Sequence, residues 1–118
     1  MTSDSFDPYA PEALPPAVVL YLNPPQGDRS SVSGAFRHDA DVTDESHTYS
    51  GRDAIQGWLA TAASQYTYTT TLTGQRREST GLWVVLARLE GNFPGGVADL
   101  RFTFEMHGDL ICRLVIAP

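Results

Sequence analysis

The sequence predicts an α+β fold, in which short helices come first and a curved antiparallel sheet follows. Two patterns carry this prediction. Up to about Ser64, apolar residues recur at helical spacing. From Tyr66 onward, apolar and polar residues alternate with period two, and turns containing glycine separate the alternating segments. We therefore expect a sheet of consecutive hairpins whose apolar face turns toward the helices.

Composition narrows the class of protein and of partner. The chain has 118 residues, of which 42% are hydrophobic and 19% charged, enough for one domain with its own core. Its net charge is −6, and all eight basic residues are arginines. An acidic chain without clustered cations argues against binding to nucleic acid or to an anionic membrane. The longest apolar run, residues 17–22, is too short to cross a bilayer, so we expect a cytoplasmic protein.

Prolines mark the beginning and the end of the first predicted helix. Residues 1–13 are polar and contain two prolines, and we expect a flexible tail before a single domain over residues 14–118. Pro16 suits the first turn of a short helix that continues through residues 17–22. The following pair of prolines, at positions 24 and 25, ends that helix.

A second short helix is expected over residues 28–36, where apolar side chains again follow helical spacing. His38 then suits the helix end, where a cation complements the helix dipole, and Asp39 suits a backbone turn. A short edge strand is expected over residues 41–45, and a polar loop is expected after it. Ser50 or Gly51 would cap the next helix, which runs to about Ser64.

The second half predicts four strands. In the strand expected over residues 97–106, Leu100, Phe102 and Phe104 share one face, while charged residues occupy the other face. Residues 74–81 are charged and read as a turn region. The expected strands cover residues 66–73, 82–90, 97–106 and 110–116, with a Gly-rich loop at 91–96 and a tight turn at 107–109.

Three groups of residues carry a resemblance to a known family. They are Phe36, Asp39, Ala40 and Val42, then Gly51, Ile55 and Trp58, and finally Phe102, Phe104, Gly108, Leu110 and Leu114. In this order they resemble the nuclear transport factor 2-like superfamily, which includes SnoaL-like and ketosteroid-isomerase-like proteins, over residues 16–118. The resemblance implies a cone-shaped sheet wrapped around the N-terminal helices, a hydrophobic pocket between them and no cofactor. It also implies a homodimer through the outer face of the sheet.

By this resemblance, Asp44 is the candidate catalytic acid, because a carboxylate follows the Asp-Ala-x-Val element in ketosteroid isomerases. A carboxylate in an apolar pocket is a stronger base than one in water. The alternative is that Asp44, beside Glu45, is a solvated loop acid. Six side chains are expected to line the pocket: Tyr21, Tyr49, Trp58, Trp83, Leu100 and Phe102.

The other parts of an isomerase site are not matched. The position of the second acid of that family falls on Leu100, and the neighbouring Asp99 belongs to the other face of its strand. The tyrosine of the family's first helix aligns near Leu20, one residue before Tyr21. A true steroid isomerase is therefore not expected, because missing oxyanion donors cost orders of magnitude in rate.

His47 is a second catalytic candidate, since histidine suits proton transfer near neutral pH. The alternative is a polar loop histidine that bonds its own backbone. The three histidines show no metal-ligand spacing, so we expect no metal site. The single cysteine, Cys112, lies in an apolar run and is expected to be a small buried residue.

Two functions of different classes remain open. The first is a cofactor-free isomerase, cyclase or dehydratase that acts on a small apolar carbonyl compound, with Asp44 as the base. The second is a non-catalytic module that binds a small hydrophobic ligand or only dimerises. The incomplete set of donors supports the second, and the position of Asp44 supports the first.

Overall fold

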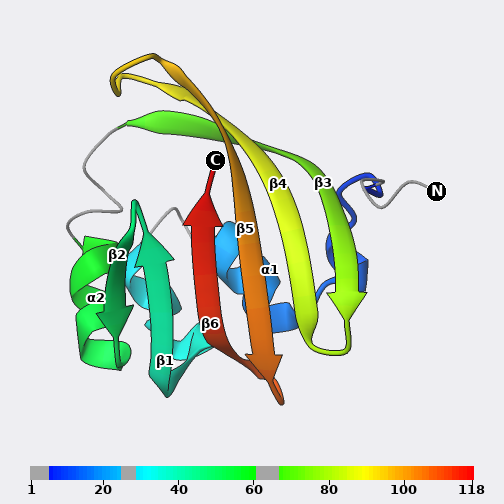
Figure 1. Cartoon of the computed structure of the whole chain (residues 1–118), viewed down its shortest axis with the longest axis vertical. Helices are drawn as coiled ribbons and strands as arrows, with labels where there is room; N and C mark the ends of the chain where they lie inside the picture. Colours follow the sequence, from blue (N-terminus) through cyan, green and yellow to red (C-terminus); the bar gives the residue numbers. More distant parts are fainter. Residues whose placement is uncertain (1–5, 25–28, 61–66) are drawn as a thin grey trace.

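The computed structural model describes residues 6–24, 29–60 and 67–118 (Figure 1). A single curved sheet has the strand order β2-β1-β6-β5-β4-β3. Its strands are β1 (Phe36–Asp44), β2 (His47–Ser50), β3 (Tyr68–Ser79), β4 (Leu82–Gly91), β5 (Val97–His107) and β6 (Leu110–Ala117). The strands pair antiparallel except β1 and β6, which pair parallel. The predicted α+β fold is thus confirmed, with a sheet that is mixed at one pairing.

The helices lie together on the concave face of the sheet, behind the strands in Figure 1. They are α1 (Pro16–Leu22), α2 (Arg52–Ala60) and 3₁₀ helices at Pro11–Ala13 and Arg29–Ala35. Val18 of α1 and Ile55 and Leu59 of α2 have no exposed surface. These side chains meet the inward residues of the strands, so the core lies between the helical layer and the sheet.

The predicted alternation of β5 is confirmed by burial. Phe104 is fully buried and Phe102 is 8% exposed, whereas Arg101 and Glu105, on either side of this pair in the sequence, face solvent. Directly opposite residues on neighbouring strands share a face, so Phe102 lies in one row with Val85 of β4 and Ile116 of β6. The neighbouring inward-facing row, nearer the turn between β5 and β6, contains Val42, Leu114, Phe104 and Trp83.

Strand β1 starts earlier than the sequence predicts. The segment before it is a 3₁₀ helix that ends at Ala35, and Phe36 already pairs with β6. His38 and Asp39 therefore lie within β1 and not at a helix end, which corrects both expectations. His38 is exposed, and the Arg37 guanidinium donates to Asp39 at 3.1 Å and holds the pKa of that carboxyl below its usual value.

Strand β3 continues through the segment predicted as a charged turn. The strand has an irregularity between Leu72 and Gly74 and then pairs with β4 as far as Ser79, leaving only Thr80 and Gly81 as the turn. The charged residues were misleading because this part of the edge strand meets solvent: Arg77 and Glu78 are exposed, and Arg76 and Glu78, two positions apart, form an ion pair.

Strand β2 stands where the sequence predicts a polar loop. Its hairpin with β1 turns through Glu45 and Ser46, which both have positive φ, at 52° and 67°. That geometry is the two-residue turn that matches the twist of a hairpin, although Asn-Gly is the usual sequence for it. Gly51, at φ 89°, then links β2 to α2 in a conformation that other residues rarely adopt.

Residues 7–10, part of the segment expected as a tail, lie at the free edge of β3. Asp7 and Gln75 exchange two backbone hydrogen bonds of 2.8 and 2.9 Å. The side chain of Gln75, only 3% exposed, accepts from the Ala10 amide at 2.8 Å and donates to the Ala10 carbonyl at 3.1 Å. Among the described residues, no helix is both long and apolar enough to cross a membrane.

Candidate functional site

Asp44 is the last residue of β1 and faces the concave side of the sheet. It shares a row with Ile116 of β6 and Phe102 of β5, both of which are buried. The carboxylate is partly buried, and its Oδ2 accepts a hydrogen bond of 3.1 Å from the indole Nε1 of Trp58. An acid with an apolar row on one side and a hydrogen-bond donor on the other is well placed to meet a ligand.

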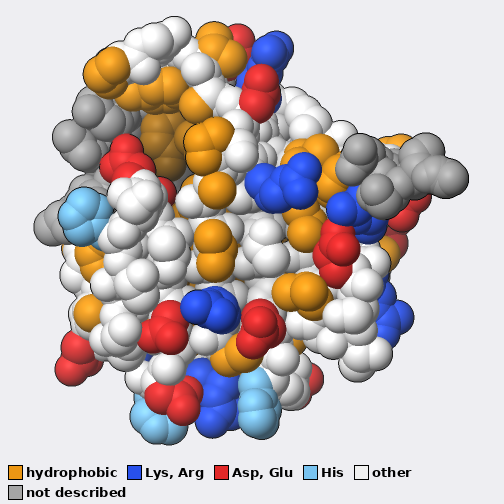
Figure 2. All heavy atoms as spheres, in the orientation of Figure 1, with side chains coloured by type: hydrophobic (Ala, Val, Ile, Leu, Met, Phe, Trp, Pro, Cys, Tyr) orange, Lys and Arg blue, Asp and Glu red, His pale blue; other side chains and the backbone are white. Residues whose placement is uncertain are grey.

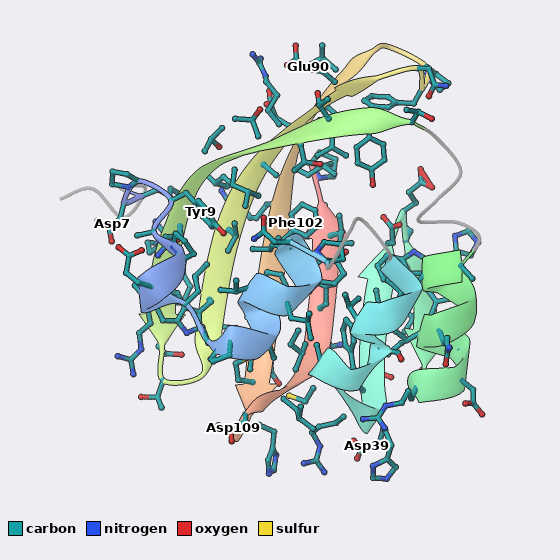
Figure 3. All side chains as sticks on the ribbon, turned by 180° about the vertical axis from the view of Figure 1, so that it is seen from behind. Asp7, Tyr9, Asp39, Glu90, Phe102 and Asp109 are labelled. Carbon is teal, nitrogen blue, oxygen red and sulfur yellow. The ribbon has the colours of Figure 1, made fainter. Side chains whose placement is uncertain are left out.

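The end of the sheet where Asp44 lies is hollowed. Figure 2 shows a hollow between the curled ends of β3 to β5 and the tip of the β1–β2 hairpin, with hydrophobic side chains on its floor and an acidic side chain on its rim. In Figure 3, Glu90 lies on the curled part of the sheet, while Asp39 and Asp109 lie at the opposite end. We call the hollowed end the open end of the sheet.

An aromatic cluster lies under the open end. Tyr21 of α1, 4% exposed, has ring centroids of Phe36, Trp58, Phe102 and Phe104 within 5.8 to 6.4 Å of its own. The ring centroid of Tyr49, in β2, lies 6.0 Å from that of Trp58. Figure 3 shows Phe102 on the concave side, next to α1. Four of the predicted pocket residues, namely Tyr21, Tyr49, Trp58 and Phe102, are thus gathered beside Asp44.

The remaining two pocket candidates lie differently. Leu100 is partly buried on the concave face, two residues from Phe102 toward the start of β5, and it pairs with Ala87. Trp83 pairs with Phe104, in the row nearer the hairpin turn, on a strand separated from β1 by β6 and β5. Leu100 therefore extends the group toward the open end, whereas Trp83 stands apart from Asp44.

His47 is the residue directly opposite Asp44 in the β1–β2 hairpin, so both side chains belong to one face. Its imidazole is exposed, and Nδ1 lies 3.3 Å from the carbonyl oxygen of Glu45 in the turn. The hairpin thus brings the two catalytic candidates to neighbouring positions, while Asp44 bonds to Trp58 and His47 bonds to its own turn.

The acid next to Leu100 does not reach the concave face. Asp99 is exposed on the outer face of β5 and forms an ion pair of 3.2 Å with Arg88. The position that holds a second acid in ketosteroid isomerases is occupied on the concave side by an apolar residue. The rings of Tyr21 and Tyr49 both lie near Trp58, with centroids 6.4 and 6.0 Å from that of the indole.

Helix α2 carries Trp58 and is fixed firmly at its start. The Gly51 amide donates to the Ala40 carbonyl at 2.8 Å, and the Arg52 guanidinium donates to the Phe36 carbonyl. Both acceptors are in β1, the strand that ends in Asp44. The indole and the carboxylate are therefore held by two elements that are themselves joined at their opposite ends.

Sequence reasoning placed Trp58 in the pocket but did not predict its bond to Asp44. A donor 14 residues away on a helix has no sequence signature. The signal for β2 was present, since two residues separate Val42–Asp44 from His47–Tyr49, but no glycine or asparagine marked the turn.

Two expectations concern single side chains elsewhere. Within residues 6–24, 29–60 and 67–118, no three His, Cys, Asp or Glu side chains gather as metal ligands would. Cys112 is half-buried on β6, and its thiol donates to the Glu105 carbonyl at 3.2 Å. Burial and, next, the charge of Glu105 raise the pKa of that thiol.

The order and arrangement of the helices and strands agree with known structures. A proposed polyketide cyclase from Sinorhizobium meliloti is 27% identical, covers 92% of this chain and 100% of its own, and superposes with a TM-score of 0.83. The chain has the nuclear transport factor 2-like fold. The resemblance predicted from the sequence is confirmed. No protein-family model matches the chain, and no curated protein matches it significantly.

Two further structures with the nuclear transport factor 2-like fold are more distant in sequence. A protein from Catenulispora acidiphila with a ketosteroid isomerase-like fold, in complex with trimethylamine, is 17% identical over 90% of this chain and 87% of its own, with a TM-score of 0.72. A proposed SnoaL-like polyketide cyclase from Jannaschia is 14% identical over 86% and 81%, with a TM-score of 0.69. These two likenesses concern the fold alone.

Proposed function

We propose that this protein binds a small, largely apolar carbonyl compound at the open end of the sheet and moves a proton on it, with Asp44 as the base and no cofactor. The observation that carries the proposal is the placement of the Asp44 carboxylate. It ends β1 beside the buried row of Ile116 and Phe102, and it is held by the Trp58 indole. The likeness to a proposed polyketide cyclase supports a carbonyl substrate, because polyketides carry ketone groups.

The chemistry is a transfer of one proton. The Asp44 carboxylate takes a proton from the carbon next to the carbonyl, and the electron pair of that C–H bond moves onto the carbonyl oxygen. The neutral acid then returns the proton to the same carbon or to another carbon of the enolate. Positioned general-base catalysis of this kind contributes about 10²–10⁴-fold. The hydroxyl groups of Tyr21 and Tyr49, whose rings both lie near Trp58, are the candidate donors to the oxygen.

Charge at the open end favours a neutral ligand. Asp44 and Glu45 are adjacent at the tip of the β1–β2 hairpin, and the chain as a whole carries a net charge of −6. An anionic ligand would be repelled here. We therefore expect ketones and enones to bind in preference to carboxylates or phosphates.

The experiment that tests the proposal needs no knowledge of the natural product. Small cyclic ketones, enones and β-diketones are incubated with the protein in D₂O, and loss of the proton signal next to the carbonyl is followed by NMR. Wild-type protein should exchange that proton faster than buffer, and Asp44→Asn should lower the enzymatic rate by about 10²-fold or more. Glu45→Gln, the same charge change one residue away, should exchange as wild type does. Equal rates for all three proteins would contradict the proposal.

A second candidate is a module that binds the same compounds without chemistry and pairs through the outer face of its sheet. It is favoured by the apolar Leu100 at the second acid position and by Asp99, which is engaged outside with Arg88. The outer face of β5 also carries charges of both signs, Asp99, Arg101 and Glu105, which suit pairing with a second copy. Ligand binding without proton exchange, together with a doubled mass in native mass spectrometry, would favour this candidate.

A further inference from the structure

We infer that Trp58 is a positioning residue, which aims the Asp44 carboxylate at the ligand, and not a wall of the pocket. The inference rests on the proposed function for its catalytic consequence. Its structural basis is the hydrogen bond of 3.1 Å from the indole Nε1 to Asp44 Oδ2, which joins α2 to the last residue of β1.

The burial of Trp58 leaves little of its ring for a ligand. The residue is 2% exposed, and both neighbouring tyrosines pack against it. The Tyr21 ring is nearly parallel to the indole, at 8° with the centroids 6.4 Å apart, and the Tyr49 ring is tilted by 32° at 6.0 Å. With its ring packed between protein groups, Trp58 meets the site through its polar edge.

The indole N–H is a donor that cannot accept, and a buried donor requires a partner. Asp44 supplies that partner, so the bond is built into the fold and does not depend on a ligand. Fixing Oδ2 fixes the plane of the carboxylate and the direction in which its second oxygen points. Holding a base in one orientation removes an entropic part of the barrier, and a misplacement of about 1 Å can cost 10²-fold in rate.

The bond is tested first without any substrate. The chain contains two tryptophans, Trp58 and Trp83, so its ¹H–¹⁵N spectrum has two indole signals, which Trp83→Phe assigns. We expect Asp44→Ala to shift the Trp58 indole signal and to speed its exchange with D₂O at least tenfold, while the Trp83 signal stays in place. Glu45→Gln should change neither signal. A Trp58 signal that is unmoved in Asp44→Ala would overturn the inference.

The positioning role is tested with Trp58→Phe, which keeps an aromatic ring and removes the N–H. Trp83→Phe is the matched control, and circular dichroism verifies that both variants are folded at the assay temperature. In the proton-exchange assay, Trp58→Phe should lower kcat about 10- to 100-fold and leave KM within about twofold. Trp83→Phe should change kcat less than twofold. A rise in KM with unchanged kcat would mean that Trp58 is a pocket wall, and would overturn the inference.

The two failures are distinguishable. If no ketone exchanges its proton with wild-type protein while the indole signal responds to Asp44→Ala, the proposed function fails and Trp58 orients an acid that only binds. If wild-type protein exchanges the proton but Trp58→Phe is as active as Trp83→Phe, the proposed function stands and the positioning role fails.

Discussion

The two edges of the sheet are held by different kinds of hydrogen bond. At the β3 edge, the Gln75 amide is matched on both sides by the backbone of Ala10 and is almost fully buried. At the β1–β2 edge, the Asp44 carboxylate is only partly buried and is held by the Trp58 indole at one oxygen. A polar group whose partners are all backbone suits a role in stability, whereas an oriented acid beside a hollow suits the role in ligand binding that we propose for Asp44.

The difference extends to the backbone. The β3–β4 turn places a glycine, Gly81, at its positive φ of 76°. The β1–β2 turn instead places Glu45 and Ser46 in left-handed conformations, which cost side-chain-bearing residues free energy. Non-glycine residues in such conformations cluster at functional sites. The edge that carries Asp44 is therefore also the edge that stores strain.

The largest expected effect on stability is at the β3 edge. Gln75→Ala leaves the Ala10 amide and carbonyl without their partners and should lower the free energy of unfolding by about 1–3 kcal/mol. Gln56→Ala, on the exposed face of α2, is the control and should change it by less than about 0.5 kcal/mol. Denaturant unfolding measures both. Equal stabilities would contradict a structural role for Gln75.

A smaller effect is expected at the link between β2 and α2. Gly51→Ala should cost about 1–2 kcal/mol because Gly51 has φ 89°, although an added Cβ would meet only the His38 carbonyl, at 3.8 Å. Gly57→Ala, inside α2 with open space around the position, should instead stabilise the protein by up to about 1 kcal/mol. Thermal unfolding of the two variants should thus give shifts of opposite sign, and shifts of the same sign would refute this account of Gly51.

The smallest effect is expected in the β1–β2 turn. Replacing Glu45–Ser46 by Asn-Gly supplies residues that accept positive φ and should stabilise the protein by about 0.5–1 kcal/mol. Unfolding in denaturant tests this, with substitution of Thr80 by Asn in the β3–β4 turn as a control that should give less. A destabilised Asn-Gly variant would show that the turn is not strained.

Much of the fold was predictable because its signals are local. The prolines at positions 15, 16, 24 and 25 bracket α1, and the alternation around Phe102 specifies β5. Charged side chains that meet solvent concealed the second half of β3, since polarity alone cannot distinguish a turn from a solvated edge strand. β2 is polar and short, and its turn lacks the glycine or asparagine that would mark a hairpin in the sequence.

The candidate site was predictable in part for the same reason. Asp44 follows a recognisable motif in β1, and Tyr21 and Phe102 lie on apolar faces that the sequence identifies. The bond from Trp58 depends on how α2 packs against β1, which is a property of the tertiary structure. The sequence predicts Trp83 in the pocket, but its place along β4 sets it in the row of Phe104, apart from Asp44, and that register is a property of the tertiary structure.

The central claim is that the β1–β2 edge carries the chemistry and the β3 edge carries stability. The most direct test measures proton exchange next to a ketone for Asp44→Asn and Gln75→Ala side by side, at a low temperature where circular dichroism shows both to be folded. The account predicts that Asp44→Asn loses about 10²-fold or more in rate at nearly wild-type stability, while Gln75→Ala keeps its rate. An Asp44→Asn variant that exchanges as fast as Gln75→Ala would contradict it.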